Sequence, residues 1–287
     1  MRLPTQLLQR KADSQKGDYG HIFILAGSRN YSGAALLCAE AAMRSGAGLV
    51  TLGVPEGISN AIIKNKLKEI MILPLPQTSN GALSGKAYSK IRDIIAKIDI
   101  LVIGPGLSLD KSTQALARKV IVNINKPMVI DADGLNALGG HPEILRKLKA
   151  ADRKFILTPH PGEMARLLAS TVNNIQKDRT GIAGKFSQRY KLTLVLKGHS
   201  TVVAGENGDL YINKTGNPGM SSAGSGDVLS GMIAAFLGQG LDSFRAAKYA
   251  VYLHGLAGDL AAKEKTQISL IASDIIAKIP EAIKRCR

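Results

Sequence analysis

Residues 21–54 read HIFILAGSRNYSGAALLCAEAAMRSGAGLVTLGV, and the order of apolar and alanine-rich runs in this segment indicates the fold class. His21 to Gly27 is a short run rich in Ile and Leu, which predicts a buried strand. Ala34 to Gly46 is rich in alanine and predicts a helix, and Leu49 to Val54 predicts a second strand. Short, nearly continuous apolar runs are typical of parallel strands that helices cover on both faces. We therefore expect the fold to begin with a strand–helix–strand unit.

The same alternation continues along the chain. A helix is predicted to begin near Asp110, and four further apolar runs predict strands: Ile98 to Gly104, Pro127 to Ala132, Phe155 to Pro159 and Leu192 to Lys197. Strands that alternate with helices indicate an α/β protein with a doubly wound, mostly parallel sheet and helices on both faces.

The pattern changes after Gly198. The runs Thr201 to Ala204 and Asp209 to Asn213 flank the turn sequence Gly205-Glu206-Asn207-Gly208, which predicts a β-hairpin. Three helices are predicted to follow: Gly226 to Leu237, Ser243 to Lys263 and Ser273 to Arg285. Because no internal repeat and no linker rich in Pro, Gly or Ser interrupts the chain, we expect residues 1–287 to form a single domain.

The composition narrows the class of protein. Of the 287 residues, 45% are apolar and 21% are charged, which is typical of a globular chain with a large core. No apolar run reaches the length of about 18 residues that a membrane-spanning helix needs, and the polar stretch from Met1 to Gly20 does not resemble a signal peptide. The two cysteines, Cys38 and Cys286, form no disulfide framework, so we expect a cytoplasmic protein.

The formal net charge is +16, from 38 Lys and Arg residues against 22 Asp and Glu residues. Such a charge attracts anionic partners, although much of it is expected to form a solvated basic surface. The basic residues are spread along the chain, and aromatic residues make up only 4% with no tryptophan, which leaves little for base stacking. We therefore expect neither a nucleic acid nor a membrane as the partner.

The segment Asn217 to Gly231, NPGMSSAGSGDVLSG, is the strongest candidate for a functional site. It opens the first of the three C-terminal helices, and Gly224 and Gly226 permit a tight turn there. The N–H groups and the dipole at a helix N-terminus attract an anion such as phosphate. Because a phosphate would repel a nearby carboxylate, Asp227 makes chemical sense as a general base that takes the proton from an attacking hydroxyl. The alternative is that Asp227 only caps the helix.

Glycines and carboxylates follow two of the predicted strands. The glycines of Gly104-Pro105-Gly106 would let the backbone approach a ligand closely, although a plain turn at the strand exit would also explain them. Asp131 and Asp133 come after the next strand, and two carboxylates beside a phosphate site suggest Mg²⁺ held directly or through water. Asp133 could instead cap the helix that starts near Leu135.

Three more side chains stand at the ends of later strands. His160 can hydrogen-bond to a ligand, and Glu163, in the first turn of a helix, could steer a hydrated cation or only interact with the helix dipole. Lys197 ends an apolar strand, where its charge needs a partner. The run Lys197 to Thr201, KGHST, offers a lysine, hydroxyls and N–H groups that suit a nucleotide. No second His or Cys stands at the spacing of a zinc site.

Together these segments resemble the ADP- or ATP-dependent NAD(P)H-hydrate dehydratase family of the ribokinase-like superfamily. The resemblance covers nearly the whole chain and rests on seven segments in the family's order: KGDYGHIFILAG (16–27), YSGAALLCAEAAMRSGAGLVTLGVP (31–55), IGPGL (103–107), DADGLNAL (131–138), LTPHPGEMARL (157–167), VLKGHST (195–201) and Gly219 to Gly231. One position departs from the family, because Ser222-Ala223-Gly224 replaces the usual Thr-Gly-Gly. The methyl group of Ala223 narrows the range of φ in the turn whose N–H groups would bind the anion.

The resemblance implies a role for each part of the site. Asp227 would be the catalytic base and would contact the substrate together with Ala34, Gly106 and His160. The adenine nucleotide would bind to Lys197, Gly198, His199, Ser200, Thr201 and Gly226. The N–H groups of Ala223, Gly224, Ser225 and Gly226 would form the anion hole, and Glu163 and Asp131 would hold Mg²⁺, directly or through water.

The implied reaction repairs hydrated NADH and NADPH. ADP or ATP, with Mg²⁺, would phosphorylate the hydroxyl of the hydrate, and elimination of phosphate would restore the reduced cofactor and leave AMP or ADP. The resemblance also implies a homotetramer and a separate epimerase that supplies the reactive epimer. The nearest alternative is a ribokinase-like kinase that acts on a vitamin-precursor alcohol with the same anion hole and the same Asp227, but stops at the phosphorylated product.

Overall fold

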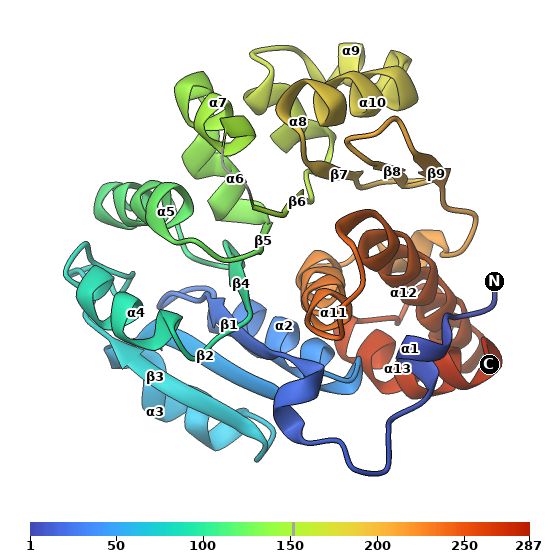
Figure 1. Cartoon of the computed structure of the whole chain (residues 1–287), viewed down its shortest axis with the longest axis horizontal. Helices are drawn as coiled ribbons and strands as arrows, with labels where there is room; N and C mark the ends of the chain where they lie inside the picture. Colours follow the sequence, from blue (N-terminus) through green and yellow to red (C-terminus); the bar gives the residue numbers. More distant parts are fainter. Residues whose placement is uncertain (151–152) are drawn as a thin grey trace.

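The computed structural model describes residues 1–150 and 153–287, and its centre is a nine-stranded sheet (Figure 1). The strands lie in the order β3-β2-β1-β4-β5-β6-β7-β8-β9. Their bounds are β1 His21–Leu25, β2 Leu49–Pro55, β3 Ile70–Leu75, β4 Ile100–Ile103, β5 Met128–Ile130, β6 Phe155–Leu157, β7 Thr193–Leu196, β8 Val202–Ala204 and β9 Leu210–Ile212. The seven strands β1 to β7 are parallel, and β8 and β9 complete the sheet as the antiparallel hairpin that the turn sequence predicts. The expected doubly wound, mostly parallel sheet is confirmed.

The edge strand β3 is the one strand among the described residues that the sequence pattern did not predict. It pairs with β2 in parallel, and its side chains are only partly buried. Pro74 interrupts the run IMILPL. A proline has no N–H group to donate to a neighbouring strand, so it is tolerated in an edge strand but not in a central one. Because β3 has a neighbour on one side only, the sheet tolerates the proline there.

Helices cover both faces of the sheet, as expected. One face carries α2 Ser32–Arg44, α3 Glu56–Asn65, α11 Ser225–Gly238, α12 Ser243–Lys265 and α13 Ala272–Arg285. The other carries α4 Ala87–Ile95, α5 Lys111–Asn123, α6 Ala132–Leu138, α7 Pro142–Ala150, α8 Pro161–Leu167 and α10 Arg179–Tyr190. The shorter elements are α1 Thr5–Leu8, α9 Val172–Lys177 and the 3₁₀ turns η1 Lys16–Tyr19 and η2 Pro218–Met220. The predicted C-terminal helices agree with α11, α12 and α13 to within two residues.

Each central strand buries both of its faces. Along β1, Ile22 and Ile24 contribute to the core under α2 and α11, whereas Phe23 and Leu25 contribute to the core on the opposite face. All four side chains are fully buried. This two-sided burial explains why the strands appear in the sequence as continuous apolar runs and not as alternating ones.

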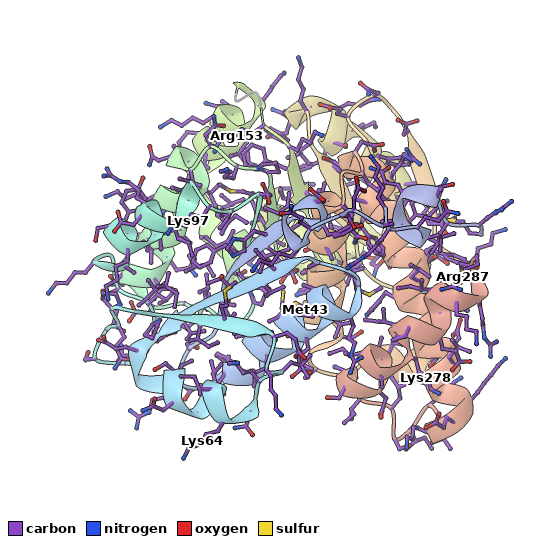
Figure 2. All side chains as sticks on the ribbon, turned by 60° about the horizontal axis from the view of Figure 1, so that its bottom comes forward. Met43, Lys64, Lys97, Arg153, Lys278 and Arg287 are labelled. Carbon is purple, nitrogen blue, oxygen red and sulfur yellow. The ribbon has the colours of Figure 1, made fainter. Side chains whose placement is uncertain are left out.

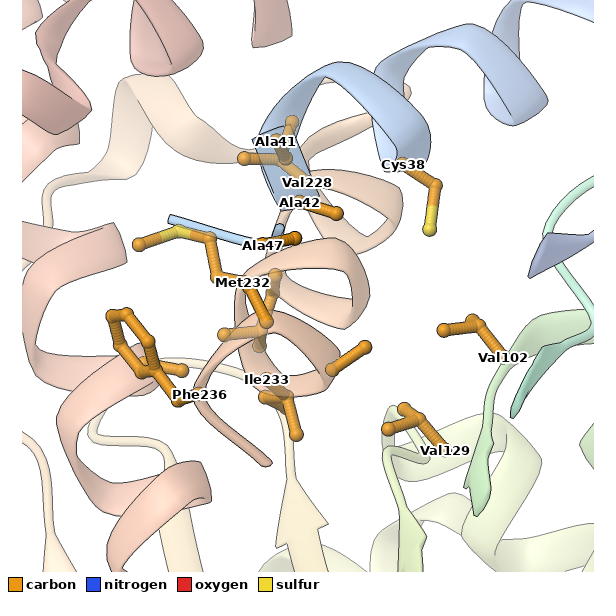
Figure 3. Packing of buried hydrophobic residues seen from close by; sticks show 14 of the residues in the cluster. Cys38, Ala41, Ala42, Ala47, Val102, Val129, Val228, Met232, Ile233 and Phe236 are labelled. Atoms are coloured by element: carbon orange, nitrogen blue, oxygen red, sulfur yellow. The ribbon is translucent and has the colours of Figure 1, made fainter. Parts of the chain in front are cut away.

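The helices α2 and α11 pack closely against each other, with small side chains between them (Figure 3). Cys38, Ala41 and Ala42 of α2 belong to the same buried core as Met232 and Phe236 of α11. A Cβ atom at Gly231 would lie 2.1 Å from the backbone carbonyl oxygen of Cys38, so a glycine is required at this crossing. The close packing fixes α11, and with it the segment 217–231, against the centre of the sheet.

The basic side chains are distributed over several sides of the molecule. Lys64, Lys97, Lys278 and Arg287 project from separate parts of its outline (Figure 2). Within residues 1–150 and 153–287, no helix combines the length and the apolar character that a membrane crossing requires.

The close packing of α2 and α11 predicts that a methyl group added at Gly231 destabilises the protein, whereas one added at Gly184, away from this crossing, does not. Gly231→Ala should destabilise the protein by about 1–3 kcal/mol, because its methyl group would overlap a backbone atom that cannot move aside. Gly184→Ala in α10 should stabilise it by roughly 0.4–1 kcal/mol, because that Cβ would come no closer than 3.8 Å to Leu210. Urea unfolding measures both free energies, and equal stability of the two variants would contradict the packing described for α2 and α11.

Candidate functional site

The candidate site lies where the carboxyl ends of the parallel strands meet the N-terminus of α11. β1 has β2 on one side and β4 on the other, so the strand order reverses beside β1. Ligands of open α/β sheets bind in the crevice at the carboxyl edge near such a reversal. The glycine-rich and polar segments that follow β4, β5, β6 and β7 all emerge at this edge.

The first turn of α11 presents unused backbone donors. Gly224 precedes the helix with φ of 89°, a left-handed conformation that favours glycine. The N–H group of Ser225 donates to the carbonyl oxygen of Ser222 at 3.4 Å, whereas those of Gly226 and Asp227 have no backbone acceptor among the described residues. Ala223 is exposed, and its φ lies outside the left-handed region. The departure from the family pattern at Ala223 therefore introduces no backbone strain.

Asp227 is a half-buried carboxylic acid in this first turn, and its side chain does not cap α11. The pKa of Asp227 is raised from 3.8 to about 7. Burial is the largest cause, the carboxylates of Asp131, Asp133 and Glu163 raise this pKa further, and the ammonium of Lys197 lowers it. A carboxyl group with a pKa near neutrality can accept and release a proton under physiological conditions. The alternative in which the Asp227 side chain caps α11 is wrong, because no side-chain capping hydrogen bond is present within the part of the chain that the structure describes.

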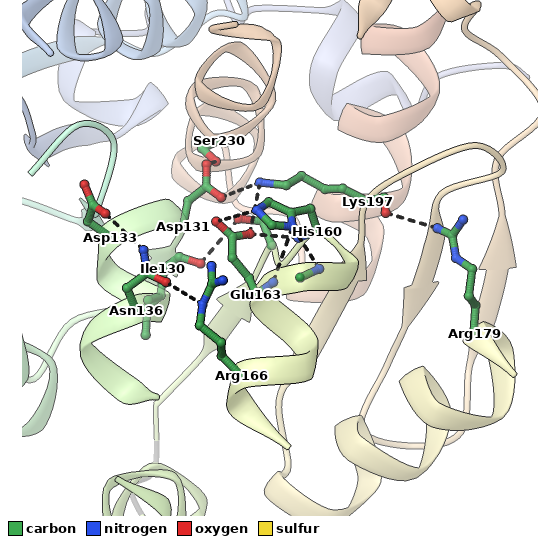
Figure 4. Close-up of polar contacts among 12 residues, drawn as sticks. Ile130, Asp131, Asp133, Asn136, His160, Glu163, Arg166, Arg179, Lys197 and Ser230 are labelled. Carbon is green, nitrogen blue, oxygen red and sulfur yellow. Dashed lines mark hydrogen bonds and ion pairs between the residues drawn. The ribbon is translucent and has the colours of Figure 1, made fainter. Parts of the chain in front are cut away.

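A charge cluster around Asp131 and Lys197 (Figure 4) lies close enough to Asp227 to shift its pKa. The ammonium of Lys197 donates to Oδ1 of Asp131 at 2.6 Å and lies 3.9 Å from Oε2 of Glu163. The hydroxyl of Ser230, one turn along α11 from Asp227, donates to Oδ2 of Asp131 at 2.7 Å. Side-chain exposure is 18% for Lys197 and 1% for Asp131, so this is a buried ion pair. The partner that the sequence required for Lys197 is Asp131.

The charged groups of this cluster shift the pKa values of Lys197 and Glu163. Burial alone would lower the pKa of Lys197, but the carboxylates of Asp131 and Glu163 more than offset it and raise this pKa above its ordinary value. Burial raises the pKa of Glu163, and Lys197 partly offsets that rise. Lys197 therefore stays positively charged and stabilises the two acidic groups beside it.

His160 caps the helix α8, a role that the sequence analysis did not consider. Its Nδ1 accepts from the N–H groups of Gly162 at 3.0 Å and Glu163 at 3.3 Å. In return, Oε2 of Glu163 accepts from the N–H group of His160 at 2.8 Å, which completes a capping box. Burial lowers the pKa of His160, and the charges of Lys197 and Arg166 lower it further. The ring is therefore neutral, and its Nδ1 is occupied by the two N–H groups. Its Nε2 lies 3.4 Å from Oε1 of Glu163 and could instead contact a ligand.

The suggestion that Asp133 caps a helix starting near Leu135 is wrong. α6 begins earlier, at Ala132, and Asp131 occupies its N-cap position without a side-chain hydrogen bond. Asp133 lies within the first turn, where its Oδ2 accepts from the N–H group of Ser108 at 2.8 Å. Asp133 thereby fixes the loop after β4 to α6.

The glycines after β4 are required by the protein's own packing. A Cβ atom at Gly104 would lie 1.7 Å from the carbonyl oxygen of Asp131, and one at Gly106 would lie 2.6 Å from that of Tyr31. The same atom at Gly106 would be 3.0 Å from the Cβ of Ala34, so the structure brings these two predicted substrate residues together. Both glycines also have positive φ, of 133° and 62°.

The loop from Lys197 to Thr201 is held by an arginine that the sequence analysis missed. Arg179, at the start of α10, donates to the carbonyl oxygens of Leu196 at 2.9 Å, Lys197 at 3.2 Å and His199 at 2.6 Å. Gly198 and Ser200 both have positive φ, of 138° and 54°. No sequence signal identifies Arg179. Its contacts are with backbone oxygens of residues 196–199, which are separated from it in the sequence by the rest of α10 and most of β7.

His254 of α12, to which the sequence analysis gave no role, lies beside the N-terminus of α11. Its Nε2 lies 3.4 Å from the hydroxyl oxygen of Ser225, the first residue of α11. Burial lowers the pKa of His254 to about 4, so the ring is neutral near pH 7. A single histidine inside an alanine-rich helix cannot be distinguished by sequence from a packing residue.

The predicted metal residues lie close together but do not offer a direct Mg²⁺ site. Both oxygens of Asp131 and one oxygen of Glu163 already accept hydrogen bonds, and the ammonium of Lys197 stands between the two carboxylates. Among the described residues, no group of three or more His, Cys, Asp or Glu side chains could hold a metal ion. The chemistry of this donor set suits a hydrated ion and not one bound directly.

Comparison with known proteins supports the resemblance. The family model for NAD(P)H-hydrate dehydratase matches residues 22–281. An ADP-dependent (S)-NAD(P)H-hydrate dehydratase of Neisseria meningitidis is 38% identical over 96% of this chain and 88% of that protein. A bifunctional NAD(P)H-hydrate repair enzyme of Moorella thermoacetica is 45% identical over 98% of this chain. The match covers 52% of that enzyme, so the chain spans about half the length of this bifunctional relative.

Solved structures agree with the family and the fold. An ADP/ATP-dependent NAD(P)H-hydrate dehydratase from Bacillus subtilis, co-crystallised with ATP and Mg²⁺, is 32% identical with a TM-score of 0.82, over 100% of this chain and 95% of that one. A ribokinase-like superfamily protein of Enterococcus faecalis is 27% identical with a TM-score of 0.81, over 99% of this chain and 95% of that one. The fold is therefore ribokinase-like. Since the family model spans most of the chain and the Neisseria protein matches over most of both sequences, this chain belongs to the NAD(P)H-hydrate dehydratase family.

Proposed function

We propose that this protein dehydrates the hydrates of NADH and NADPH at the expense of ADP or ATP, with residues 1–287 acting as one catalytic domain. The observation that carries this proposal is Asp227, a carboxyl group with a pKa of about 7 beside the open first turn of α11. A base and an anion site side by side are what a phosphoryl transfer to a hydroxyl requires. The names of the relatives supply the identity of the substrate.

In the proposed first step, Asp227 takes the proton from the hydroxyl on the reduced nicotinamide ring. The hydroxyl oxygen then forms a bond with the terminal phosphorus of ADP, and the bond to the bridging oxygen breaks so that AMP leaves. The N–H groups of Ala223, Gly224, Ser225 and Gly226 stabilise the negative charge on the transferred phosphoryl group. With ATP as the donor, ADP is the leaving group.

In the proposed second step, the ring loses phosphate instead of hydroxide. Hydroxide is a poor leaving group, whereas phosphate carries the departing electron pair readily. The C–O bond breaks, the adjacent ring carbon loses a proton, and the double bond of the reduced nicotinamide is restored. Ala34, Gly106 and His160 would position the ring. The adjacency of Ala34 and Gly106 supports this assignment, and Nε2 of His160, 3.4 Å from Oε1 of Glu163, could exchange that contact for one with the ring.

The nucleotide would bind on the β7 side of the site. The loop Lys197, Gly198, His199, Ser200 and Thr201 stands there together with Gly226, and a Cβ atom at Gly226 would lie 3.3 Å from the ammonium of Lys197. Because Lys197 is already paired with Asp131, it would contribute positive potential near the phosphates without giving up that partner. Arg179 would keep the loop in place through its backbone contacts.

Mg²⁺ would enter bound to the nucleotide phosphates and would meet Asp131 and Glu163 through water. When bound, the ion neutralises phosphate charge during the transfer. A contact through water is consistent with the structure, because most oxygens of these two carboxylates already accept hydrogen bonds from protein donors.

The remaining parts of the proposal rest on the family. We propose a cytoplasmic homotetramer, and an epimerase activity that supplies the reactive epimer of the hydrate. The alternative, a kinase for a vitamin-precursor alcohol, would release a phosphorylated product. Measuring the products with hydrated NADH and ADP separates the two, because the dehydratase releases NADH, AMP and phosphate in equal amounts.

The base assignment predicts a large loss of activity in Asp227→Asn. The amide keeps the shape of the side chain but cannot take a proton, so kcat should fall by about 10²–10⁴ with little change in ADP affinity. The rate is followed by the absorbance of reduced nicotinamide after mixing protein, Mg²⁺, ADP and hydrated NADH, and calorimetry gives the affinity. Asp93→Asn, on the exposed surface of α4, is the matched control. A variant that kept more than about a tenth of the wild-type kcat would show that Asp227 is not the base.

The raised pKa of Asp227 predicts a pH-dependent gain of stability in the same variant. The folded protein holds a proton up to about pH 7 that the unfolded chain releases near 3.8. The stability from this group is complete below the lower pKa and is lost as the pH rises to the higher one, where the buried carboxylate ionises. Asp227→Asn stays neutral, so it should raise Tm more at about pH 8 than at about pH 4. The same Tm difference at both pH values, measured by thermal unfolding, would contradict the raised pKa.

A further inference from the structure

Arg166 of α8 presents an open guanidinium fork beside the predicted substrate residues. Its Nε donates to Oδ1 of Asn136 at 3.0 Å, and the terminal nitrogens of this guanidinium have no acceptor in the described part of the chain. The charge of Arg166 lowers the pKa of both His160 and Glu163, so the guanidinium is within electrostatic reach of both. Figure 4 shows the Arg166 side chain directed toward them.

A chain of hydrogen bonds holds this arginine in place. Nδ2 of Asn136 donates to Oδ1 of Asp133 at 3.0 Å, and Oδ2 of Asp133 accepts from the N–H group of Ser108 at 2.8 Å. Ser108 belongs to the same loop as Gly106 and has a positive φ of 80°. Arg166 is thus linked through two side chains to the loop after β4, which carries a predicted substrate residue. An arginine held by its Nε keeps its two terminal groups in the geometry that binds a phosphate through two hydrogen bonds.

A hollow of about 480 Å³ adjoins this arginine. Its lining combines Arg166 and Asn136 with Leu109, Gly139 and Gly140. Leu109 is 68% exposed, and a Cβ atom at Gly140 would meet no atom within 4 Å. One wall is therefore apolar, another has no side chains, and a guanidinium stands at the edge. This combination suits a flat apolar group attached to a phosphate.

We propose that this hollow binds the adenosine half of the hydrated dinucleotide, with Arg166 on the phosphate next to the adenosine and Leu109 against the base. The proposal rests on the proposed function, since it assigns a part of that substrate to a part of this site. NADH and NADPH both carry a diphosphate and an adenosine, so the hollow would serve both hydrates.

The position of the hollow favours the dinucleotide over ADP, which also contains an adenosine. Arg166, Asn136 and Leu109 belong to α8, α6 and the loop after β4, the same elements that carry His160, Asp133 and Gly106. The proposed ADP loop follows β7 and is fixed by Arg179 from α10. In Figure 4, Asn136 and Arg166 lie on one side of Asp131 and Glu163, and Arg179 lies on the other.

The test measures binding of NADH, the reaction product, by its fluorescence, because binding needs no turnover. Arg166→Gln should weaken NADH binding by about tenfold, and Arg166→Lys, which keeps the charge but loses the fork, should weaken it less. Leu109→Ser should also weaken NADH binding. Reduced nicotinamide mononucleotide lacks the adenosine half, so its affinity should change by less than about twofold in all three variants.

ADP affinity, measured by calorimetry, should be the same in these variants as in the wild type, and Arg92→Gln on the exposed surface of α4 controls for the loss of one positive charge. The inference is overturned if Arg166→Gln and Leu109→Ser bind NADH as the wild type does, or if they lose NADH and the mononucleotide equally. If Arg166→Gln and Leu109→Ser lose ADP binding but keep NADH binding, the hollow belongs to the co-substrate and the inference is overturned. A failure of the proposed function is a different result, in which the wild type binds NADH but does not dehydrate the hydrate.

Discussion

The buried ion pair between Lys197 and Asp131 is the contact on which the rest of the site depends. It joins the end of β7 to the end of β5, two strands that are separated in the sheet by β6. Ser230 adds α11 to the same contact through Oδ2 of Asp131. A buried charge without its partner costs about 3–5 kcal/mol, so neither residue can be changed alone without a large loss of stability. The pair therefore sets the position of the α11 N-terminus relative to the carboxyl edge of the sheet.

The same pair sets the electrostatics of Asp227. Burial and the nearby carboxylates raise the pKa of Asp227, and only the ammonium of Lys197 opposes them among the principal influences. The balance leaves a carboxyl group that titrates near pH 7, next to backbone donors that attract an anion. A fully ionised carboxylate would repel the phosphate, and a fully protonated one would not accept the proton of the hydroxyl. A pKa between these limits would allow the proposed base and the proposed anion site to share one turn of helix.

Sequence patterns predicted the parts of this protein that local physics determines. Two-sided burial produces the continuous apolar runs of β1, β2 and β4 to β7, and the turn at Gly224 marks the start of α11. The patterns failed where a long-range contact decides. β3 was missed because Pro74 is tolerated only at a sheet edge, which a single segment cannot reveal. The alternative of a cap at Asp133 was wrong because the partner of Asp133, the N–H group of Ser108, is brought to it only by the folded sheet edge. Arg179 was not identified, since its contacts with residues 196–199 exist only after α10 packs on β7.

Asp227 is inferred to titrate near neutrality because it is buried among carboxylates whose effect Lys197 only partly offsets. Carbon-13 NMR of the side-chain carboxyl groups, with the Asp227 signal assigned through the Asp227→Asn variant, measures this pKa directly in the folded protein. The account predicts a midpoint at about 7. A midpoint near the ordinary value of 3.8 would contradict it, because Asp227 would then be an ionised surface carboxylate with no basis for its proposed role.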